Sequence, residues 1–213
     1  MRKLLLLGLL GVAATLALTA AAMGSFASHY GADLDAIPHD PAADGGSNVQ
    51  GQAQLTLHGT SVHVVLHVRG LSPNLPHAMH IHGDLAAQNE CPPASADVHG
   101  LTASDPPDGL VDLGEGAPFY GPIQSSFTTT GDTSPASGLA LERFPVADSQ
   151  GHLDYDRTFE IPQDVIDRLG TLHIVVHGLD LSDDGMDNYD GNGNTLFEAT
   201  LPVACGQLVQ RGH

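Results

Sequence analysis

Two histidines separated by a single aliphatic residue are the part of this sequence best suited to chemistry. They are His80 and His82, within the run His-Ala-Met-His-Ile-His-Gly at 77–83. On an extended strand alternate side chains lie on one face, so the two imidazoles would project together about 7 Å apart. Met79 and Ile81 would then face the core. Imidazole pairs bind copper, zinc, nickel and iron; the alternative is a strand whose solvated face carries two histidines.

A third histidine can complete such a site from a second strand. His177 ends an apolar stretch at 172–177. If this stretch is a strand beside the one that carries His80 and His82, the three imidazoles share a face and can bind one ion. His99 lies in the long loop that follows the strand of His80 and His82, and it is a candidate fourth ligand.

The elements that position these histidines are expected to be β-strands, because apolar and polar residues alternate along several stretches of the chain. Together they predict an all-β sandwich or barrel. We expect strands at 51–58, 61–69, 77–83, 123–130, 153–161, 172–177 and 198–205, and one short helix at 162–169. The stretches 84–121 and 180–194 are rich in Gly, Asp, Asn and Pro and are expected to be loops. Long loops in a compact domain commonly build a functional site.

The N-terminus has the pattern of a secretory signal. Two basic residues precede an apolar run and small residues follow it, so we predict a signal peptide at 1–27. The apolar run is close to membrane-spanning length, so an uncleaved anchor is the alternative. We predict a flexible linker at 28–50, one β domain at 51–207 and a C-terminal tail at 208–213. The protein is therefore expected to be secreted, or to reside in the cell envelope or periplasm.

Composition agrees with export and excludes some partners. The chain has 25 acidic and 7 basic residues and a net charge of −18. Such a surface repels nucleic acid and anionic membranes, and it would also repel an anionic substrate. Only two cysteines are present, Cys91 and Cys205. In an exported chain we expect them to pair; the alternative is two separate buried thiols.

Several of these pieces occur in the order typical of the copper/zinc superoxide dismutase family, which the chain resembles between about 51 and 206. The matching pieces are Gly-Leu-Ser-Pro at 70–73, His77, the His80–His82 pair, Cys91, Asp-Leu-Gly at 112–114, Val-Val-His at 175–177 and Ala-Cys-Gly at 204–206. The resemblance implies a Greek-key β-barrel with copper on its outer face. It also implies that the two cysteines form the family's disulfide.

The resemblance further assigns a role to each histidine of the site. His80, His82 and His177 would be copper ligands. His99 would take the place of the family's bridging histidine, and His77 would be a structural histidine that forms hydrogen bonds. In this family copper alternates between two oxidation states and converts superoxide to oxygen and hydrogen peroxide.

The chain departs from the family at the zinc site and at the residue that guides superoxide. Asp112 stands at the zinc-binding aspartate, but Gly109 replaces a zinc-binding histidine. Zinc is therefore not expected, and Asp112 is interpreted as a remnant of that site. Pro202 replaces the family's guiding arginine. The arginines that could take over its role in space are Arg143, Arg157 and Arg168.

Other interpretations are compatible with the sequence. The chain could be a non-catalytic relative that binds copper, or a structural protein of the cell envelope. It could also be a chordin-type repeat domain, a class with a similar histidine strand that does not account for the cysteines or for His177.

The acidic run 183–194 is either a weak calcium site or a solvated loop. His63 and His67 would lie about 13 Å apart on a strand, too far to share one ion. The oligomeric state is not predicted.

Overall fold

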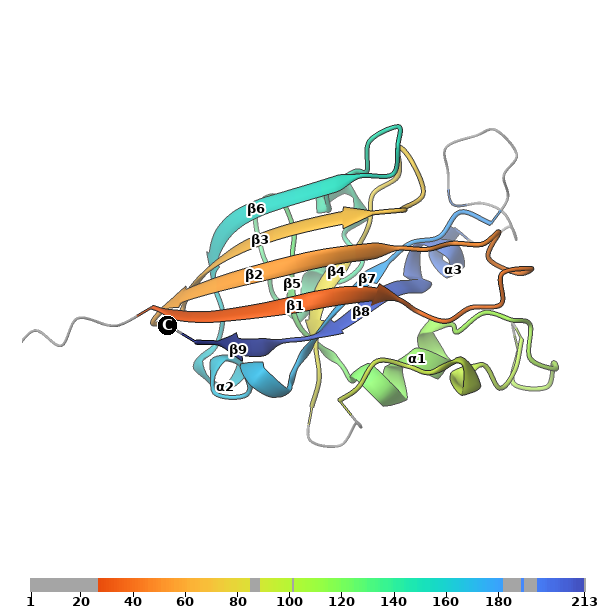
Figure 1. Cartoon of the computed structure of the whole chain (residues 1–213), viewed down its shortest axis with the longest axis horizontal. Coiled ribbons are helices and arrows are strands. Elements are labelled where there is room, and N and C mark those ends of the chain that lie inside the picture. The colour runs from red at the N-terminus through yellow and green to blue at the C-terminus, as the bar shows by residue number, and fades with distance from the viewer. Residues whose placement is uncertain (1–26, 85–88, 101, 182–188, 190–194, 213) are drawn as a thin grey trace, which may run out of the picture.

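One antiparallel β-sheet, curled into a half-barrel, contains all nine strands of the described residues (Figure 1). The structure, a computed structural model, describes residues 27–84, 89–100, 102–181, 189 and 195–212. The strands are β1 (Ser28–Ala36), β2 (Gln50–His58), β3 (Ser61–Arg69), β4 (Met79–His82), β5 (Ile123–Ser126), β6 (Leu153–Glu160), β7 (His173–His177), β8 (Pro202–Gln207) and β9 (Val209–Arg211). Their spatial order is β5-β4-β7-β8-β1-β2-β3-β6, and β9 pairs with β1. The mostly-β prediction is confirmed.

The helical content is small and lies in the connections between strands. The α-helices are α1 (Leu113–Tyr120), α2 (Gln163–Ile166) and α3 (Thr195–Thr200). Short 3-10 turns occupy Ala94–Ala96, Pro135–Ser137, Leu141–Arg143 and Leu169–Thr171. The helix predicted at 162–169 is therefore reduced to α2, which is followed by a 3-10 turn.

The hairpin of β2 and β3 shows how alternation builds the core. The strands pair from Gln50 with Arg69 to His58 with Ser61. Leu55 and Val64, paired across this ladder, are both buried. Together with alternate residues of the neighbouring strands they form the main core inside the curled sheet. In Figure 1 the strands β6, β3, β2 and β1 form the front layer of this sheet, and β5, β4 and β7 lie behind it.

Side chains bridge the two edge strands of the curled sheet, β5 and β6. Phe127, directly after β5, stacks on Tyr155 of β6 with ring centroids 5.6 Å apart. The carbonyl oxygen of Thr128 accepts hydrogen bonds from Tyr155 Oη at 3.0 Å and from Arg157 Nη1 at 2.6 Å. These contacts join the two edges of the sheet and hold it in its curled shape.

The prediction of a flexible linker at 28–50 is wrong for its first part, which is strand β1. This strand pairs with β2 from Ser28 opposite Leu57 to Leu34 opposite Gly51, and it also pairs with β8 and β9. Its glycine, alanines and aspartates have low strand propensity, which hides the alternation. Pairing with three strands and burial of Leu34 outweigh that preference. The β domain therefore includes β1.

Other predicted boundaries also need correction. The predicted loop at 84–121 contains α1, whose N-terminus is stabilised by a capping box between Asp112 and Glu115. The strand predicted at 198–205 is replaced by the end of α3 and by β8. The strand predicted at 123–130 ends at Ser126, and β9 lies within the predicted tail.

Two predictions concern parts of the chain that the structure does not describe. The predicted signal at 1–27 lies outside the described residues except for its last position. The calcium alternative at 183–194 also falls on residues that are not described, apart from Tyr189. Within the described ranges, no helix combines the length and the apolar character needed to cross a membrane.

Candidate metal centre

Strands β4 and β7 place three histidines on the outer face of the sheet. The two strands are neighbours, with His80 opposite Val175 and His82 opposite His173. Residues paired across a ladder share a face, so the odd-numbered residues of β7, His177 among them, project on the same side as His80 and His82. Met79 and Ile81 point into the core, where they are fully buried. The alternation predicted for both strands is confirmed.

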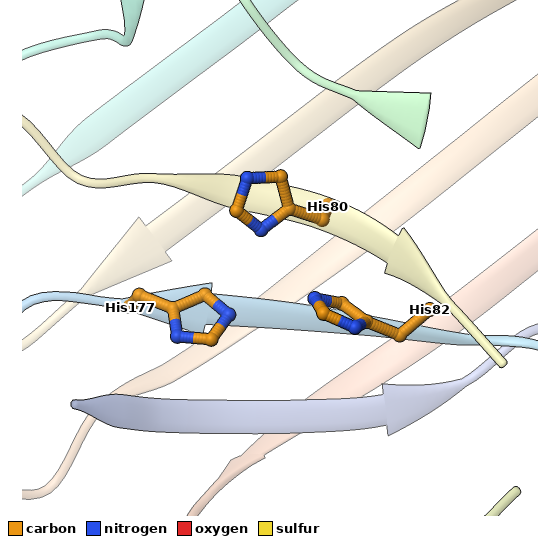
Figure 2. A group of neighbouring side chains, drawn as sticks. All are labelled: His80, His82 and His177. Atoms are coloured by element: carbon orange, nitrogen blue, oxygen red, sulfur yellow. The ribbon is translucent and has the colours of Figure 1, made fainter. Parts of the chain in front are cut away.

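The ring nitrogens of His80, His82 and His177 come together (Figure 2). One nitrogen from each ring lies within 4.8 Å of the others. The ring centroids are 5.3 Å apart for His80 and His82, 5.3 Å for His80 and His177, and 5.6 Å for His82 and His177. Among the described residues this is the one such group of His, Cys, Asp or Glu, and all three side chains are buried. The group can hold a metal ion.

Backbone carbonyls fix the orientation of each ring. A neutral imidazole has one N–H donor and one lone pair, so donation from one nitrogen leaves the lone pair on the other. The contacts are His80 Nε2 to Gly138 O at 3.1 Å, His82 Nδ1 to Gly121 O at 2.8 Å and His177 Nδ1 to Thr200 O at 2.8 Å.

The other nitrogen of each ring is buried and has no hydrogen-bond partner among the described residues. These atoms are His80 Nδ1, His82 Nε2 and His177 Nε2. They are the nitrogens that carry the lone pairs when the opposite nitrogens donate to carbonyls. Histidines that bind metals characteristically donate their second N–H in this way, which fixes the tautomer and the ring orientation.

Burial keeps the three rings uncharged at neutral pH. Loss of solvation lowers the pKa of His82 to about 3 and that of His177 to about 4. The pKa of His80 is held well below its usual range by burial, with a further contribution from the neighbouring His177 and His82. The lone pairs are therefore available to a cation without competition from protons.

The three carbonyls come from three separate segments that cover the outer face. Gly121 follows α1, Gly138 follows the turn Pro135–Ser137, and Thr200 ends α3. The disulfide between Cys91 and Cys205, expected from the sequence, is present and closes a separation of 114 residues. It attaches the segment that leads to α1 to strand β8, which is the neighbour of β7.

Aromatic rings pack against the histidines from these covering segments. Tyr120, the last residue of α1, meets the His82 ring edge to face at a centroid distance of 4.7 Å. Phe144 meets the His80 ring in the same manner at 5.3 Å. These contacts limit rotation of the two imidazoles. The Tyr120 hydroxyl is buried without a hydrogen-bond partner among the described residues, and burial raises its pKa.

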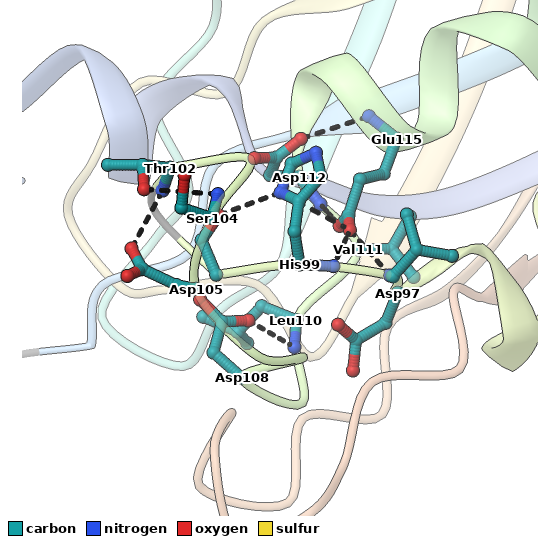
Figure 3. A network of polar contacts seen from close by, with 12 residues as sticks. Asp97, His99, Thr102, Ser104, Asp105, Asp108, Leu110, Val111, Asp112 and Glu115 are labelled. Atoms are coloured by element: carbon teal, nitrogen blue, oxygen red, sulfur yellow. Dashed lines mark hydrogen bonds and ion pairs between the residues drawn. The ribbon is translucent and has the colours of Figure 1, made fainter.

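The structure does not bring His99 to the three-histidine group, which corrects the prediction of a fourth ligand. His99 lies in the loop network of Figure 3. Its Nδ1 donates to Gly100 O at 2.7 Å and is 3.7 Å from Glu115 Oε1. Buried Glu115 also accepts the backbone N–H groups of Val98 and His99. This network holds His99 at the start of α1, away from the group.

Asp112 has a different role from the one the family pattern suggests. Its Oδ1 accepts a hydrogen bond from Glu115 N at 3.0 Å, while Glu115 Oε2 accepts one from Asp112 N at 3.0 Å. Asp112 is thus the N-cap of α1. In the described part of the chain it belongs to no group of potential metal ligands.

His77 connects the Gly-Leu-Ser-Pro turn to the end of β7. It is fully buried; its Nε2 lies 2.9 Å from Ser72 O and its Nδ1 lies 3.0 Å from His177 O. These contacts position the backbone of His177, whose ring belongs to the three-histidine group. Burial lowers the pKa of His77, against the influence of the surrounding carbonyls.

None of the described arginines lines the pocket at the three histidines. Arg143 donates to Ser137 Oγ at 2.8 Å and to Asp132 O at 3.1 Å. Arg157 is bound to Thr128 O, and Arg168 donates to Asp164 O at 2.9 Å. None of these three arginines is therefore in a position to replace the guiding arginine.

Comparison with known proteins adds no relative. No protein-family model matches the chain, and a search of curated proteins found no match either. The functional argument therefore depends on the geometry of the three histidines and their surroundings.

Proposed function

We propose that this protein is an exported copper-binding protein of the superoxide dismutase-like type, with His80, His82 and His177 as ligands. The observation that carries the proposal is the convergence of three buried ring nitrogens without partners. A buried polar atom left unpaired costs about 1–3 kcal/mol. A cation bound to all three lone pairs would remove that cost.

The ligand set suits copper. The group has three neutral nitrogens and, among the described residues, no carboxylate. Imidazole suits copper in both oxidation states, and copper is bound most strongly in the first-row series. When bound, copper would supply one-electron redox chemistry at this face of the sheet. The chain's own residues supply fixed, uncharged rings and a covering layer that limits contact with water.

The strand order supports a Greek-key barrel. If the bridged edge strands β5 and β6 are taken as neighbours, β4, β5 and β6 follow one another around the sheet, and β7 lies beside β4. Three consecutive strands with the next strand beside the first form the Greek-key pattern. The position of the histidines on β4 and at the end of β7 agrees with the superoxide dismutase resemblance.

Export is supported by the disulfide. The Cys91–Cys205 bond indicates an oxidising compartment. The signal-like N-terminus at 1–27 agrees with this location. We therefore place copper binding outside the cytoplasm, in the secreted fraction or the cell envelope.

Superoxide dismutation is the second candidate, favoured by the pocket that reaches the three rings from outside. The same pocket argues that the reaction would be slow, because no described arginine lines it and the chain carries a net charge of −18. Electrostatic attraction is what brings an anion to a buried centre at high rates. We therefore propose copper binding as the primary function.

Metal uptake by the purified protein tests the proposal. We expect one copper ion per chain in the wild type, loss of binding in His80→Ala, and unchanged binding in His63→Ala, whose side chain lies on the exposed face of β3. Superoxide consumption by the copper-loaded protein then separates the two candidates: fast turnover supports the dismutase, and binding without turnover supports the copper binder. Absence of copper uptake, or retention of copper by His80→Ala, would contradict both.

A further inference from the structure

A pocket of about 330 Å³ leads from the surface to the three histidine rings. Its walls are largely apolar and include Leu113, Ala117, Tyr120, Ile123 and Leu139. Leu113 and Leu139 are 44% and 58% exposed, whereas most large apolar side chains of the described chain are buried. The approach to the candidate metal centre is therefore an apolar passage that opens to solvent.

The charges around this pocket disfavour an anionic ligand. No arginine, aspartate or glutamate is among its lining residues, and the chain as a whole is strongly acidic. An anion would lose its hydration on entry, and because no cationic side chain lines the pocket, only the bound copper ion would offset its charge. A neutral molecule loses little solvation and gains contact with the leucine and tyrosine side chains.

We propose that this pocket binds a neutral, largely apolar molecule that carries one nitrogen or sulfur donor. The inference rests on the proposed function, because the donor atom would bind copper at the three histidines. The apolar body would lie against Leu113, Ala117 and Ile123. The volume is at the lower end of the range for small-molecule sites, which limits the ligand to one or two rings or a short chain.

The size of the apolar contribution follows from the area that such a body buries. A phenyl group removed from water in this pocket should tighten binding about 10- to 100-fold over the donor alone. Imidazole and 4-phenylimidazole form a suitable pair of probes, since they present the same donor and differ by that group. Azide serves as the anionic probe.

The test titrates each probe into copper-loaded protein and follows the copper absorption or its electron paramagnetic resonance spectrum. We expect 4-phenylimidazole to bind at least about 10-fold more tightly than imidazole, and azide to bind more weakly than 4-phenylimidazole. Equal affinities for the two imidazoles, or tightest binding of azide, would overturn the inference.

A rim variant tests whether the pocket is responsible. Leu113 is the first residue of α1, where a carboxylate is compatible with the helix, so Leu113→Asp should fold. We expect it to abolish the preference for 4-phenylimidazole. Val146→Asp is the matched control, because Val146 is 57% exposed and does not line the pocket. A preference that persists in Leu113→Asp would contradict the assignment.

Copper content measured in the same samples separates the two proposals. If copper does not bind, the proposed function fails and the ligand inference fails with it. If copper binds in the expected ratio and the phenyl group gives no advantage, only the ligand inference is overturned.

Discussion

The Nδ1 atom of His82 lies 2.8 Å from the carbonyl oxygen of Gly121, a residue 39 positions further along the chain. This hydrogen bond turns Nε2 of His82 toward His80 and His177. Gly121 has a φ of 77°, and a Cβ added there would lie 2.9 Å from both Asp84 N and Gly83 Cα. The segment after α1 therefore determines the orientation of a ring on β4.

Gly121→Ala should weaken copper binding without removing a ligand. The new Cβ would force the carbonyl away from His82, and loss of a partner that orients a ligand typically lowers metal affinity about 10- to 100-fold. Competition with a copper chelator measures the change. Gly46→Ala is the control, because Gly46 also has a positive φ but a Cβ there meets nothing within 4 Å. Equal affinities in the two variants would show that the Gly121 contact does not orient the ring.

Loss of the disulfide should lower both stability and copper affinity. The Cys91–Cys205 bond closes 114 residues, for which the chain-entropy model gives a stabilisation of about 4–5 kcal/mol. The double variant Cys91→Ser/Cys205→Ser should also hold copper less tightly, because the segment that carries Tyr120 and Gly121 is no longer attached to β8. Chemical denaturation and chelator competition measure the two effects. A reducing agent should destabilise the wild type and leave the double variant unchanged; the opposite pattern would contradict this role.

The metal-free protein should lose stability as the pH falls below about 6.5. In the unfolded chain histidine titrates near 6.5, whereas burial lowers the pKa to about 3 for His82 and to about 4 for His177. The unfolded state therefore binds more protons throughout this interval, and the free energy of unfolding decreases as the pH falls. Between pH 6.5 and 5 each of these two histidines should lower the free energy of unfolding by about 2 kcal/mol.

Urea denaturation at pH 7.5 and pH 5 measures this loss. The variant His63→Gln, altered on the exposed face of β3, should show the same difference between the two pH values as the wild type. A wild type that is equally stable at both values would mean that the ligand histidines are not buried in their neutral form.

Leu34→Ala should test whether β1 belongs to the folded domain. Leu34 is buried in the main core, and removal of a buried leucine side chain costs about 2–5 kcal/mol. Val209→Ala, on the exposed strand β9, should change the free energy of unfolding by no more than about 0.5 kcal/mol. If the two variants were equally stable, residues 28–36 would behave as the linker that the sequence alone suggested.

The histidines of the candidate site could be predicted because their signal is local. The alternation in 77–83 and 172–177 places His80, His82 and His177 on one face of their strands. The sequence alone could not show that these two strands are neighbours, and the pairing of β4 with β7 shows that they are. The mostly-β fold could be predicted for the same reason, since alternation marks most of the strands.

The parts that could not be predicted depend on tertiary contacts. The acceptors for the three rings are the backbone carbonyls of Gly121, Gly138 and Thr200, and no residue type marks a carbonyl as a partner. Strand β1 is composed of residues that disfavour strands and is held by its neighbours. His99 was misplaced because the capping interactions of Glu115, which hold it at α1, are visible only in the folded loop.

The most direct measurement of the central claim is a crystal structure of the copper-loaded protein with anomalous scattering recorded at the copper edge. We predict a single anomalous peak between His80 Nδ1, His82 Nε2 and His177 Nε2, with Nδ1 of His82 still bound to Gly121 O. A copper peak elsewhere, such as on the exposed face of β3 beside His63, or no peak between the three histidines in protein saturated with copper, would contradict the account.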